Sequence, residues 1–450
     1  MDAKQIMKIF EDTAYVRMGG SMEELKAAEY LKGKCEELGF AAEIVPFDVD
    51  MATIQEAKLF VDGEEITCKG YFNAGNAELE APFYYLRSTD KYTLSQCKGK
   101  IVMIDGQEIT CKGYFNAGNA EIEAPFYYLR STDKYTLSGC KGKIVMIDGY
   151  MGYWMYQDLL ENGAVGFITY DGNINYADRD IDQRELRAQV HKGNKIPGVN
   201  INAKDAVKLI SGGAKTAKIV LRQHEYVGQS RNVVMDMPGE IDEYIAFTAH
   251  YDSTSLSQGA YDNMSGSVGI LGIAEHFAKN PHRYGLRFIW CGSEERGLLG
   301  AKAYCANEEA LKNCVLNINL DMIGCIMGKF IACATTEEKL VGYIEYLGME
   351  QGMAVAARQG VYSSDSTPFA DKGIPAVSFA RLAPPNTGTI HNSYDTIALM
   401  SGEQMVQDIE FLVAFSDRMA NAVKMPVAKE IPENMKEKLD EYLTRKRPKK

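Results

Sequence analysis

Strand-like apolar segments alternate with amphipathic helical segments from about residue 226 onward. A chain with this alternation folds into a mostly parallel sheet that is covered by helices on both faces. Core packing explains the apolar residues that recur at helical spacing over 264–278 and 402–420. The pattern therefore predicts an α/β fold. It also predicts where a site would lie, because open α/β sheets bind ligands outside the carboxyl ends of their strands.

Histidines and carboxylates occur at these strand ends. Pairs follow the predicted strands EYIAFTA and LRFIWCGS, one acid follows VLNINL, and two further candidates lie in GAYDNMSG and IHNSYDT. The residues that share this placement are His250, Asp252, Asp262, Glu294, Glu295, Asp321 and His391. Two histidines with three or four carboxylates suit two borderline divalent ions such as zinc, with one carboxylate left for proton transfer. The set indicates a hydrolase.

The chemistry of a two-metal site indicates how these side chains divide their roles. Two cations about 3.5–4 Å apart need a bridging ligand, and Asp262, in a Gly-rich loop before a helix, suits that role. Neighbouring side chains point in different directions, so one of Glu294 and Glu295 can bind metal while the other accepts a proton from water. Asp252 lies two residues beyond His250 and is placed to fix the tautomer of that histidine.

At 450 residues the chain is long enough for two domains. The predicted catalytic domain comprises 1–50 and 226–428, and it is interrupted by a β-rich inserted domain over 51–225. The basic residues near the C-terminus make 429–450 a predicted charged tail.

The inserted domain contains a tandem copy. Residues 63–105 and 106–148 are one 43-residue unit written twice, with differences only at positions 64/107, 79/122 and 96/139. Repeats that build solenoids usually diverge and occur at least in threes, so two nearly identical copies indicate a recent duplication or a sequence error rather than a duplicated binding site. We expect the start of the first copy and the end of the second to occupy the ordinary places in the sheet. The sequence between them is then an extra hairpin or a poorly ordered excursion.

Composition excludes several classes of partner. A net charge of −12 argues against nucleic acid, because phosphate binding needs a basic surface. No apolar stretch approaches the ~18 residues of a membrane span, and the N-terminal segment lacks the apolar core of a secretory signal. Ten cysteines without a C-x-x-C pair are then expected to be reduced thiols. The prediction is a cytoplasmic protein without membrane contact, and homo-oligomerisation stays open.

Five strings in order resemble the motifs of the double-zinc aminopeptidase family: AHYDS, GAYDNMSG, CGSEERGLLGA, NLDMIG and IHNSYDT. That family shares its fold with glutamate carboxypeptidase, glutaminyl cyclase and the transferrin receptor. The resemblance covers about 250 residues. The inserted domain is more weakly similar to a protease-associated domain, through CKGKIVMIDG and ENGAVGFITY.

Carried over residue by residue, the resemblance implies two zinc ions that share one carboxylate. The ligands that it implies are His250, Asp262 and Asp321 for one ion, and Asp262, Glu295 and His391 for the other. It further implies that Glu294 is the general base and that Asp252 lies behind His250. Cobalt or manganese could replace zinc among such ligands.

The segment SSDSTPFADKGIPAVSF resembles the substrate-side loop of the family, in which many members have Ser-Asp-His. Here Asp365 is followed by Ser366, so a substrate contact made by that histidine is in doubt. Tyr362 is a candidate hydroxyl donor to a tetrahedral oxyanion, and a plain buried tyrosine is an equal alternative.

The expected function is a zinc-dependent aminopeptidase that acts on peptides, with a water bridged by two zinc ions and Glu294 as general base. One alternative is a carboxypeptidase or dipeptidase on the same scaffold, for which Arg358 or Arg381 could bind the C-terminal carboxylate of the substrate. An alternative of another class is a catalytically silent binding or scaffold protein, which would be expected to have lost ligands. The chain has kept the full set.

Overall fold

The computed structural model describes residues 1–61, 64–67, 77–81, 84–85, 111–113, 117–172, 181, 183–385 and 387–447. The chain divides into two compact units, each with a hydrophobic core of its own. Unit 1 comprises Met1–Val49 and Gln229–Lys450, and unit 2 comprises Asp50–Gly228. The long strands β1 (Ala42–Val61) and β10 (Thr216–Met237) contribute residues to both units.

A mixed sheet forms the centre of unit 1, in the strand order β15-β14-β16-β13-β11-β12-β10. Its four middle strands, β16, β13, β11 and β12, are parallel, whereas β14 and β10 run antiparallel to their neighbours β16 and β12. The strand bounds are β11 (Ile241–His250), β12 (Tyr284–Cys291), β13 (Cys314–Leu320), β14 (Lys329–Thr335), β15 (Ala356–Gln359) and β16 (Ala376–Leu382).

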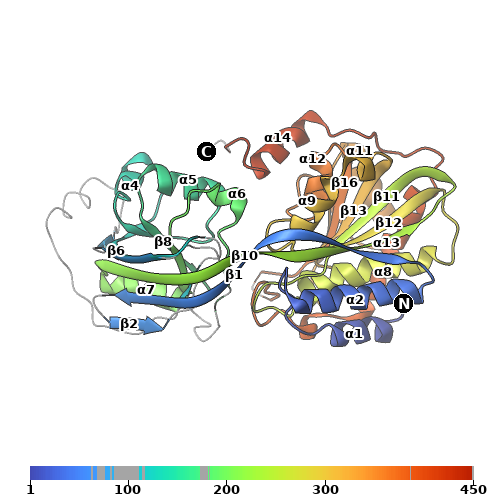
Figure 1. The fold of residues 1–450 in the computed structure, drawn as a ribbon. Coiled ribbons are helices and arrows are strands. Elements are labelled where there is room, and N and C mark those ends of the chain that lie inside the picture. The colour runs from blue at the N-terminus through green and yellow to red at the C-terminus, as the bar shows by residue number, and fades with distance from the viewer. Residues whose placement is uncertain are drawn as a thin grey trace. The chain divides into compact units, whose positions relative to one another are not determined.

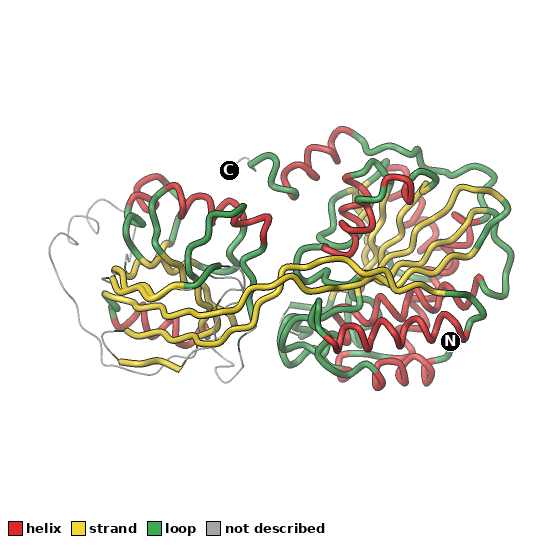
Figure 2. Tube along the Cα trace, in the orientation of Figure 1, coloured by secondary structure: helices red, strands yellow, loops and turns green. Residues whose placement is uncertain are grey.

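Helices cover both faces of this sheet (Figures 1 and 2). α8 and α13 pack on one face, and α9 and α12 on the other. Successive residues of β11 alternate between the two faces, so that Phe247 belongs to the larger core under α8 and Ala246 to the smaller core under α9. The predicted α/β fold is thereby confirmed. The helical bounds in unit 1 are α1 (Ala3–Asp12), α2 (Met22–Glu37), the π-helical turn η2 (Ala260–Met264), α8 (Ser265–Phe277), α9 (Leu299–Cys305), α10 (Glu308–Leu311), α11 (Glu338–Gln351), α12 (Ser366–Asp371), the 3-10 turn η3 (Ile397–Leu399), α13 (Gly402–Ala420) and α14 (Glu433–Tyr442).

The start of α2 differs from the capping box that Ser21-Met22-Glu23-Glu24 predicts. The hydroxyl of Ser21 accepts a hydrogen bond from the backbone N–H of Glu24 at 3.1 Å, as expected for an N-cap. The carboxylate of Glu24 does not complete the box. It is fully buried and accepts from Gly20 N–H at 2.9 Å and from the hydroxyl of Ser230 at 2.6 Å. Glu24 therefore links α2 to β10.

The predicted charged tail over 429–450 requires a correction, because it contains the helix α14. Ile431, Met435 and Leu439 are spaced four residues apart and are buried together against Ala370 and Ala376. Met435 and Leu439 lie on one side of α14, because residues four apart share a face of a helix, and Ile431 joins them from just before the helix begins. The charged side chains of the segment occupy its other faces.

Unit 2 has a second sheet, in the strand order β10-β6-β7-β8-β9-β5. The strands β6, β7, β8 and β9 are parallel, and β10 runs antiparallel to β6. The bounds in this unit are β2 (Glu64–Thr67), β3 (Ala77–Ala81), β4 (Tyr84–Tyr85), β5 (Cys111–Gly113), β6 (Ala120–Leu129), α4 (Lys134–Ser138), β7 (Ile144–Ile147), α5 (Tyr153–Glu161), β8 (Gly166–Asp171), α6 (Ala188–His191), β9 (Gly198–Asn202) and α7 (Ala203–Gly212).

The two copies of the 43-residue unit lie side by side in part of this sheet. β3 of the first copy pairs in parallel with β6 of the second, and each residue faces its own duplicate, from Ala77 opposite Ala120 to Ala81 opposite Ala124. β4 continues the same pairing. The start of the first copy pairs with β1 through β2, and the end of the second copy forms α4 and β7. The expected hairpin or excursion falls on 86–110, which lies outside the described residues.

Gly139 distinguishes the second copy from the first, which has Gln96 at the same position. A Cβ atom at Gly139 would lie 2.7 Å from the ring of Tyr127. Tyr127 is buried and cannot easily move, because its hydroxyl donates a hydrogen bond to the carbonyl of Thr136 at 2.7 Å. The position after α4 therefore accommodates the glycine of the second copy and disfavours the glutamine of the first.

This contact predicts different stabilities for the two possible single-copy proteins. Deletion of 63–105 leaves Gly139 in place and should preserve the melting temperature. Deletion of 106–148 removes Tyr127 and leaves its first-copy counterpart Tyr84, so Gln96 meets the tyrosine in place of a glycine. The melting temperature should then fall by about 5 °C, as expected for an overpacked core. Adding Gln96→Gly to that second deletion should restore it. Thermal unfolding of the three proteins makes the comparison, and equal melting temperatures for the two deletions would contradict the role of Gly139.

In the described part of the chain, no helix is both long enough and apolar enough to cross a bilayer.

Candidate functional site

The carboxyl ends of three neighbouring parallel strands bring most of the predicted site residues together. β11 ends at His250, while Glu294 follows β12 by three residues and Asp321 follows β13 directly. Asp262 reaches the same place from η2, which precedes α8, and His391 from the loop after β16. The sheet order β13-β11-β12 explains the convergence, because adjacent parallel strands end at one edge.

The first of two triads of potential ligand atoms comprises His250, Asp262 and Asp321, all of them buried. His250 Nε2 lies 3.2 Å from Asp262 Oδ1 and 3.7 Å from Asp321 Oδ1. The second triad comprises Asp262, Glu295 and His391. His391 Nε2 lies 3.1 Å from Asp262 Oδ2 and 3.0 Å from Glu295 Oε2.

Asp262 belongs to both triads, and its two oxygens face opposite ways. Oδ1 is the atom next to His250, and Oδ2 is the atom next to His391. A carboxylate that bridges two cations needs this arrangement. Two ligands about 2.0–2.1 Å from a tetrahedral zinc lie about 3.3 Å apart, so the separations in both triads fit such an ion.

The charge of the site also fits cations. The side chains of Asp262, Glu294, Glu295 and Asp321 are each no more than 11% exposed. Burial raises the pKa of Glu294 well above its usual value, and the neighbouring acids add to the shift while His250 opposes it. Buried carboxylates at this density need compensating positive charge.

The carboxylates also raise the pKa values of the two histidines. Burial alone would lower the pKa of His391, but the carboxylates of Glu295 and Asp262 outweigh it and raise this pKa well above its usual value. Burial likewise opposes the shift at His250, where Glu294 and the nearby aspartates raise the pKa. Burial would raise the pKa of Asp262, yet its hydrogen bonds to both histidines hold it below its usual range. The donors therefore form one strongly coupled group.

Two further aspartates hold the loops that carry the donors. Asp252 is fully buried 3.4 Å from His250 Nδ1, and it accepts from the backbone N–H of Glu294 at 2.9 Å and of Glu295 at 3.3 Å. Asp395 is also buried and accepts from the backbone N–H of Tyr261 at 2.8 Å and of Asp262 at 3.1 Å. Asp252 thus lies beside His250, as its spacing in the sequence predicts, whereas Asp395 was not predicted. A signal for it was present in IHNSYDT, where Asp395 follows His391 by four residues.

The backbone is left-handed at three positions within or next to the donor set. Ser293 has φ of 52°, Met322 has 66° and His391 has 60°. Residues other than glycine rarely adopt this conformation, and where they do so it often serves a functional site. Here it turns the chain immediately before Glu294 and immediately after Asp321.

The three predicted substrate-side residues have different surroundings. Tyr362 is partly buried, and burial, followed by the charges of Asp321 and Asp262, raises the pKa of its phenol. Asp365 is fully buried, and Asp252 and Asp321 influence its ionisation. Ser366 is 2% exposed, and its hydroxyl hydrogen-bonds to that of Ser378 at 2.7 Å. Ser366 is thus directed into the core at the start of α12.

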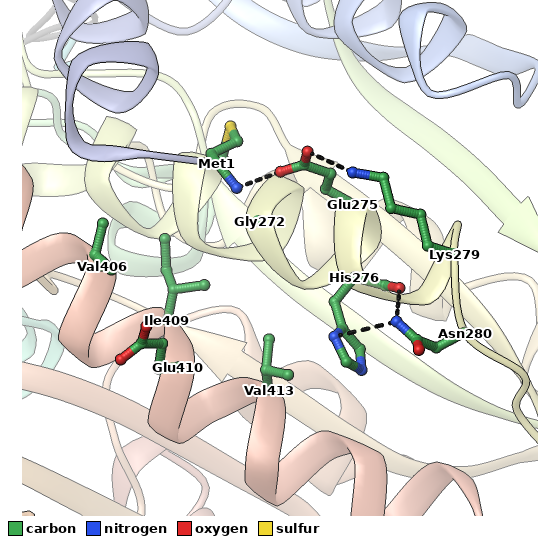
Figure 3. Close-up of a pocket in the computed structure, with 10 residues that line it drawn as sticks. All are labelled: Met1, Gly272, Glu275, His276, Lys279, Asn280, Val406, Ile409, Glu410 and Val413. Carbon is green, nitrogen blue, oxygen red and sulfur yellow. Dashed lines mark hydrogen bonds and ion pairs between the residues drawn. The ribbon is translucent and has the colours of Figure 1, made fainter.

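A cavity of about 390 Å³ lies elsewhere in unit 1, between α8 and α13 (Figure 3). Val406, Ile409 and Val413 line its apolar side, and Met1, Glu275 and His276 lie on the other side. The N-terminal ammonium group pairs with Glu275 there. None of the predicted site residues is among the described residues that line this cavity.

Solved structures of known proteins share this fold. A zinc aminopeptidase from Bacillus subtilis aligns over 96% of this chain and 98% of its own, with a TM-score of 0.69 and 23% identity. An aminopeptidase from Aneurinibacillus sp. strain AM-1 aligns over 95% of this chain and 96% of its own, with a TM-score of 0.68 and 22% identity. The fold is therefore that of the aminopeptidase structures.

Sequence relatives are consistent with the same class. Aminopeptidase YwaD of Bacillus subtilis is 31% identical over 265 residues, which is 55% of this chain and 56% of that protein. Leucine aminopeptidase 1 of Arthroderma otae is 28% identical over 233 residues, which is 45% of this chain and 61% of that protein. The match thus spans less than two thirds of either relative.

Residues 232–414 match the family model of peptidase family M28. This segment contains every donor described above and most of unit 1. The segment that contains the donors is therefore similar to peptidase family M28, and the family resemblance inferred from the motifs is confirmed. The matched segment begins after the end of unit 2, so a protease-associated domain in that unit stays a prediction.

Asp365 generates a prediction about pH. Burial raises its pKa to about 7, and the neighbouring aspartates add to the shift while His250 opposes it. A carboxyl with a raised folded-state pKa contributes stability that is complete below the unfolded pKa near 3.9 and is lost as the pH rises through about 7. Asp365→Asn removes the ionisable group, so its melting temperature should fall less than that of the unmodified protein between pH 5 and 8. Thermal unfolding of both chelator-treated proteins checks this, and parallel pH profiles would refute it.

Proposed function

We propose that this chain is a metallo-aminopeptidase that hydrolyses N-terminal residues from peptides with two zinc ions. The observation that carries the proposal is the position of Asp262, whose two oxygens face two separate triads of potential ligand atoms. The names of the relatives support the activity, since several are called aminopeptidases and one a zinc aminopeptidase. Because those sequence matches cover only part of the relatives, the activity is inferred for this chain rather than transferred to it.

The proposed ligands follow from the two triads. One ion would be held by His250, Asp262 and Asp321, and the other by Asp262, Glu295 and His391. Nitrogen and oxygen donors of this kind suit zinc, and cobalt or manganese could substitute. When bound, zinc would act as a Lewis acid toward the peptide carbonyl and would lower the pKa of a water molecule.

Glu294 is the proposed general base. Its Oε2 lies 3.9 Å from His250 Nε2, so its carboxylate borders the first triad. Positive charge at the triads lowers the pKa of this buried carboxyl, so cation binding favours the ionised form that can accept a proton. The same group can then donate that proton to the departing amine. Asp252 fixes where Glu294 lies, through its hydrogen bond to the backbone N–H of Glu294.

The substrate side is proposed from Tyr362 and its loop. The phenol, whose pKa is raised by burial and by the charges of Asp321 and Asp262, can donate a hydrogen bond to an oxyanion that forms at the scissile carbonyl. Asp365 and Ser366 anchor this loop to the core, because Asp365 is fully buried and the hydroxyl of Ser366 is hydrogen-bonded to that of Ser378. We therefore assign direct substrate contact to Tyr362 and not to Ser366, whose hydroxyl is bonded to Ser378.

The carboxypeptidase alternative is disfavoured by the contacts of Arg381 and by the position of Arg358, the two arginines that it requires. The guanidinium of Arg381 donates to both oxygens of the buried Asp408, at 3.1 and 2.9 Å from Nε. Its charge is thus already neutralised within the fold. Arg358 lies on β15, three strands away from β13 in the sheet order. Neither arginine is placed to bind the C-terminal carboxylate of a peptide at the triads.

A single experiment tests the aminopeptidase assignment. The zinc-loaded protein is incubated with one short peptide in free, N-acetylated and C-amidated forms, and the products are identified by mass spectrometry. Cleavage of the free and amidated forms alone is expected, because an aminopeptidase needs the free N-terminal amine. Cleavage of the free and acetylated forms alone would instead identify a carboxypeptidase. Absence of cleavage in a protein that binds zinc would reject the proposal for simple peptides.

Glu294→Gln should separate proton transfer from metal binding. The variant retains the shape of the side chain but cannot accept the proton, so turnover should fall by about 10²- to 10⁴-fold. Its zinc content should remain that of the unmodified protein. Glu410→Gln, on an exposed position of α13, is the matched control and should leave both properties unchanged. Near-normal turnover of Glu294→Gln would remove Glu294 from the role of base.

A further inference from the structure

Arg17 is a fully buried arginine in the segment between α1 and α2. Among the described residues, no other arginine and no lysine has a buried side chain. Long charged side chains are almost never buried in this way unless a specific interaction requires it. The function proposed above uses no residue of this segment, although Arg17 touches the loop that connects the donors.

Most of the contacts of Arg17 with distant residues fall on one loop of the site. Its Nε donates to the carbonyl of Tyr251 at 2.8 Å. Its terminal nitrogens donate to the carbonyls of Gln258 at 2.5 Å and of Gly259 at 3.0 Å. The backbone of Arg17 joins the same loop, because its N–H donates to Ser253 Oγ at 3.0 Å and its carbonyl accepts from Ser253 N–H at 3.2 Å.

The remaining donors of Arg17 hold its own segment in place. Nη1 also donates to the carbonyl of Thr13 at 2.7 Å and of Tyr15 at 2.9 Å. The guanidinium thus fastens the turn after α1 to a loop more than 230 positions away in the chain. The planar fork of an arginine can bond several carbonyls at once, which a lysine cannot reproduce.

The loop held by Arg17 connects two proposed ligands of the first triad, His250 and Asp262. Tyr251 lies between His250 and Asp252, and Gly259 precedes Asp262 by three residues. One guanidinium therefore fixes both ends of the connection between the histidine and the bridging carboxylate. Gly259 permits the close approach, since a Cβ atom there would lie 2.9 Å from Arg17 Nη2.

Arg17 forms no ion pair with a described residue. All five acceptors of its guanidinium are uncharged carbonyl oxygens. Burial lowers the pKa of Arg17 to about 10, and the charges of Asp395 and Asp252 partly oppose this, so the group stays protonated near neutral pH. A buried cation without an ion pair is costly, and here it lies beside a group of buried carboxylates.

We propose that Arg17 is a positioning residue that sets the separation of His250 from Asp262 and thereby the affinity of the site for zinc. This inference rests on the proposed two-zinc function. The ion assigned to His250, Asp262 and Asp321 should depend on Arg17 more strongly than its neighbour. The second ion shares only Asp262 with the loop and takes its other ligands from Glu295 and His391.

The test measures zinc affinity by competition with a chromogenic chelator. Arg17→Lys keeps the positive charge but loses the planar guanidinium. One of the two zinc ions should then bind about 10- to 100-fold more weakly, as is typical when a group that orients metal ligands is changed. Saturating zinc should restore turnover, because Arg17 touches no reacting atom. Leu347→Ala, buried in α11, is the control, and it should lower the melting temperature without changing zinc affinity.

Ser253→Ala is a milder second variant for the case in which Arg17→Lys does not fold. It removes the hydroxyl that accepts from Arg17 and donates to the carbonyl of Ser257 at 2.9 Å, and a loss of about threefold or more in zinc affinity is expected. Unchanged zinc affinity in these variants, with a lower melting temperature, would make Arg17 purely structural and overturn the inference. Failure of the unmodified protein to bind zinc would instead reject the two-zinc function, which is a separate result.

Discussion

Mutual repulsion among buried carboxylates is the constraint on which the rest of unit 1 depends. Four acids and two histidines share one small volume, and Asp262 contacts both histidines. Such a group is held together by the elements around it. Asp252 binds the backbone of the Glu294 loop, Asp395 binds the backbone before Asp262, and Arg17 fixes the connection between β11 and η2. The sheet supplies the edge, and these three side chains hold the donors at that edge against their own repulsion.

The placement of the donors could be predicted from sequence because it follows from strand order alone. In parallel strands, a residue just past the carboxyl end has only one edge to occupy, so His250, Glu294 and Asp321 had to meet if β11, β12 and β13 were neighbours. Helix bounds followed equally well from periodicity, as α8 and α13 show. The residue pattern within a strand or helix was therefore sufficient to predict the ends of that element and the residues that follow it.

Contacts between distant segments could not be predicted in this way. Ser21-Met22-Glu23-Glu24 reads as a capping box, but Ser230, more than 200 positions later, binds the carboxylate of Glu24. Arg17 lies in a turn without any motif, and three of the carbonyls that its guanidinium bonds lie beyond position 250. The apolar spacing in α14 was visible, yet the charged residues around it indicated a tail. In each case the deciding partner comes from another part of the chain.

The pairing of β3 with β6 bears on how such a sheet can grow. A strand that is copied in tandem carries the same alternation and length as its source, so the copy matches the hydrogen-bonding edge of the original residue by residue. Lateral addition at that edge leaves β7, β8 and β9 in their order and the donors of unit 1 untouched. A strand can therefore take up added sequence by pairing with its own copy, without a new fold, and only three positions distinguish the two copies.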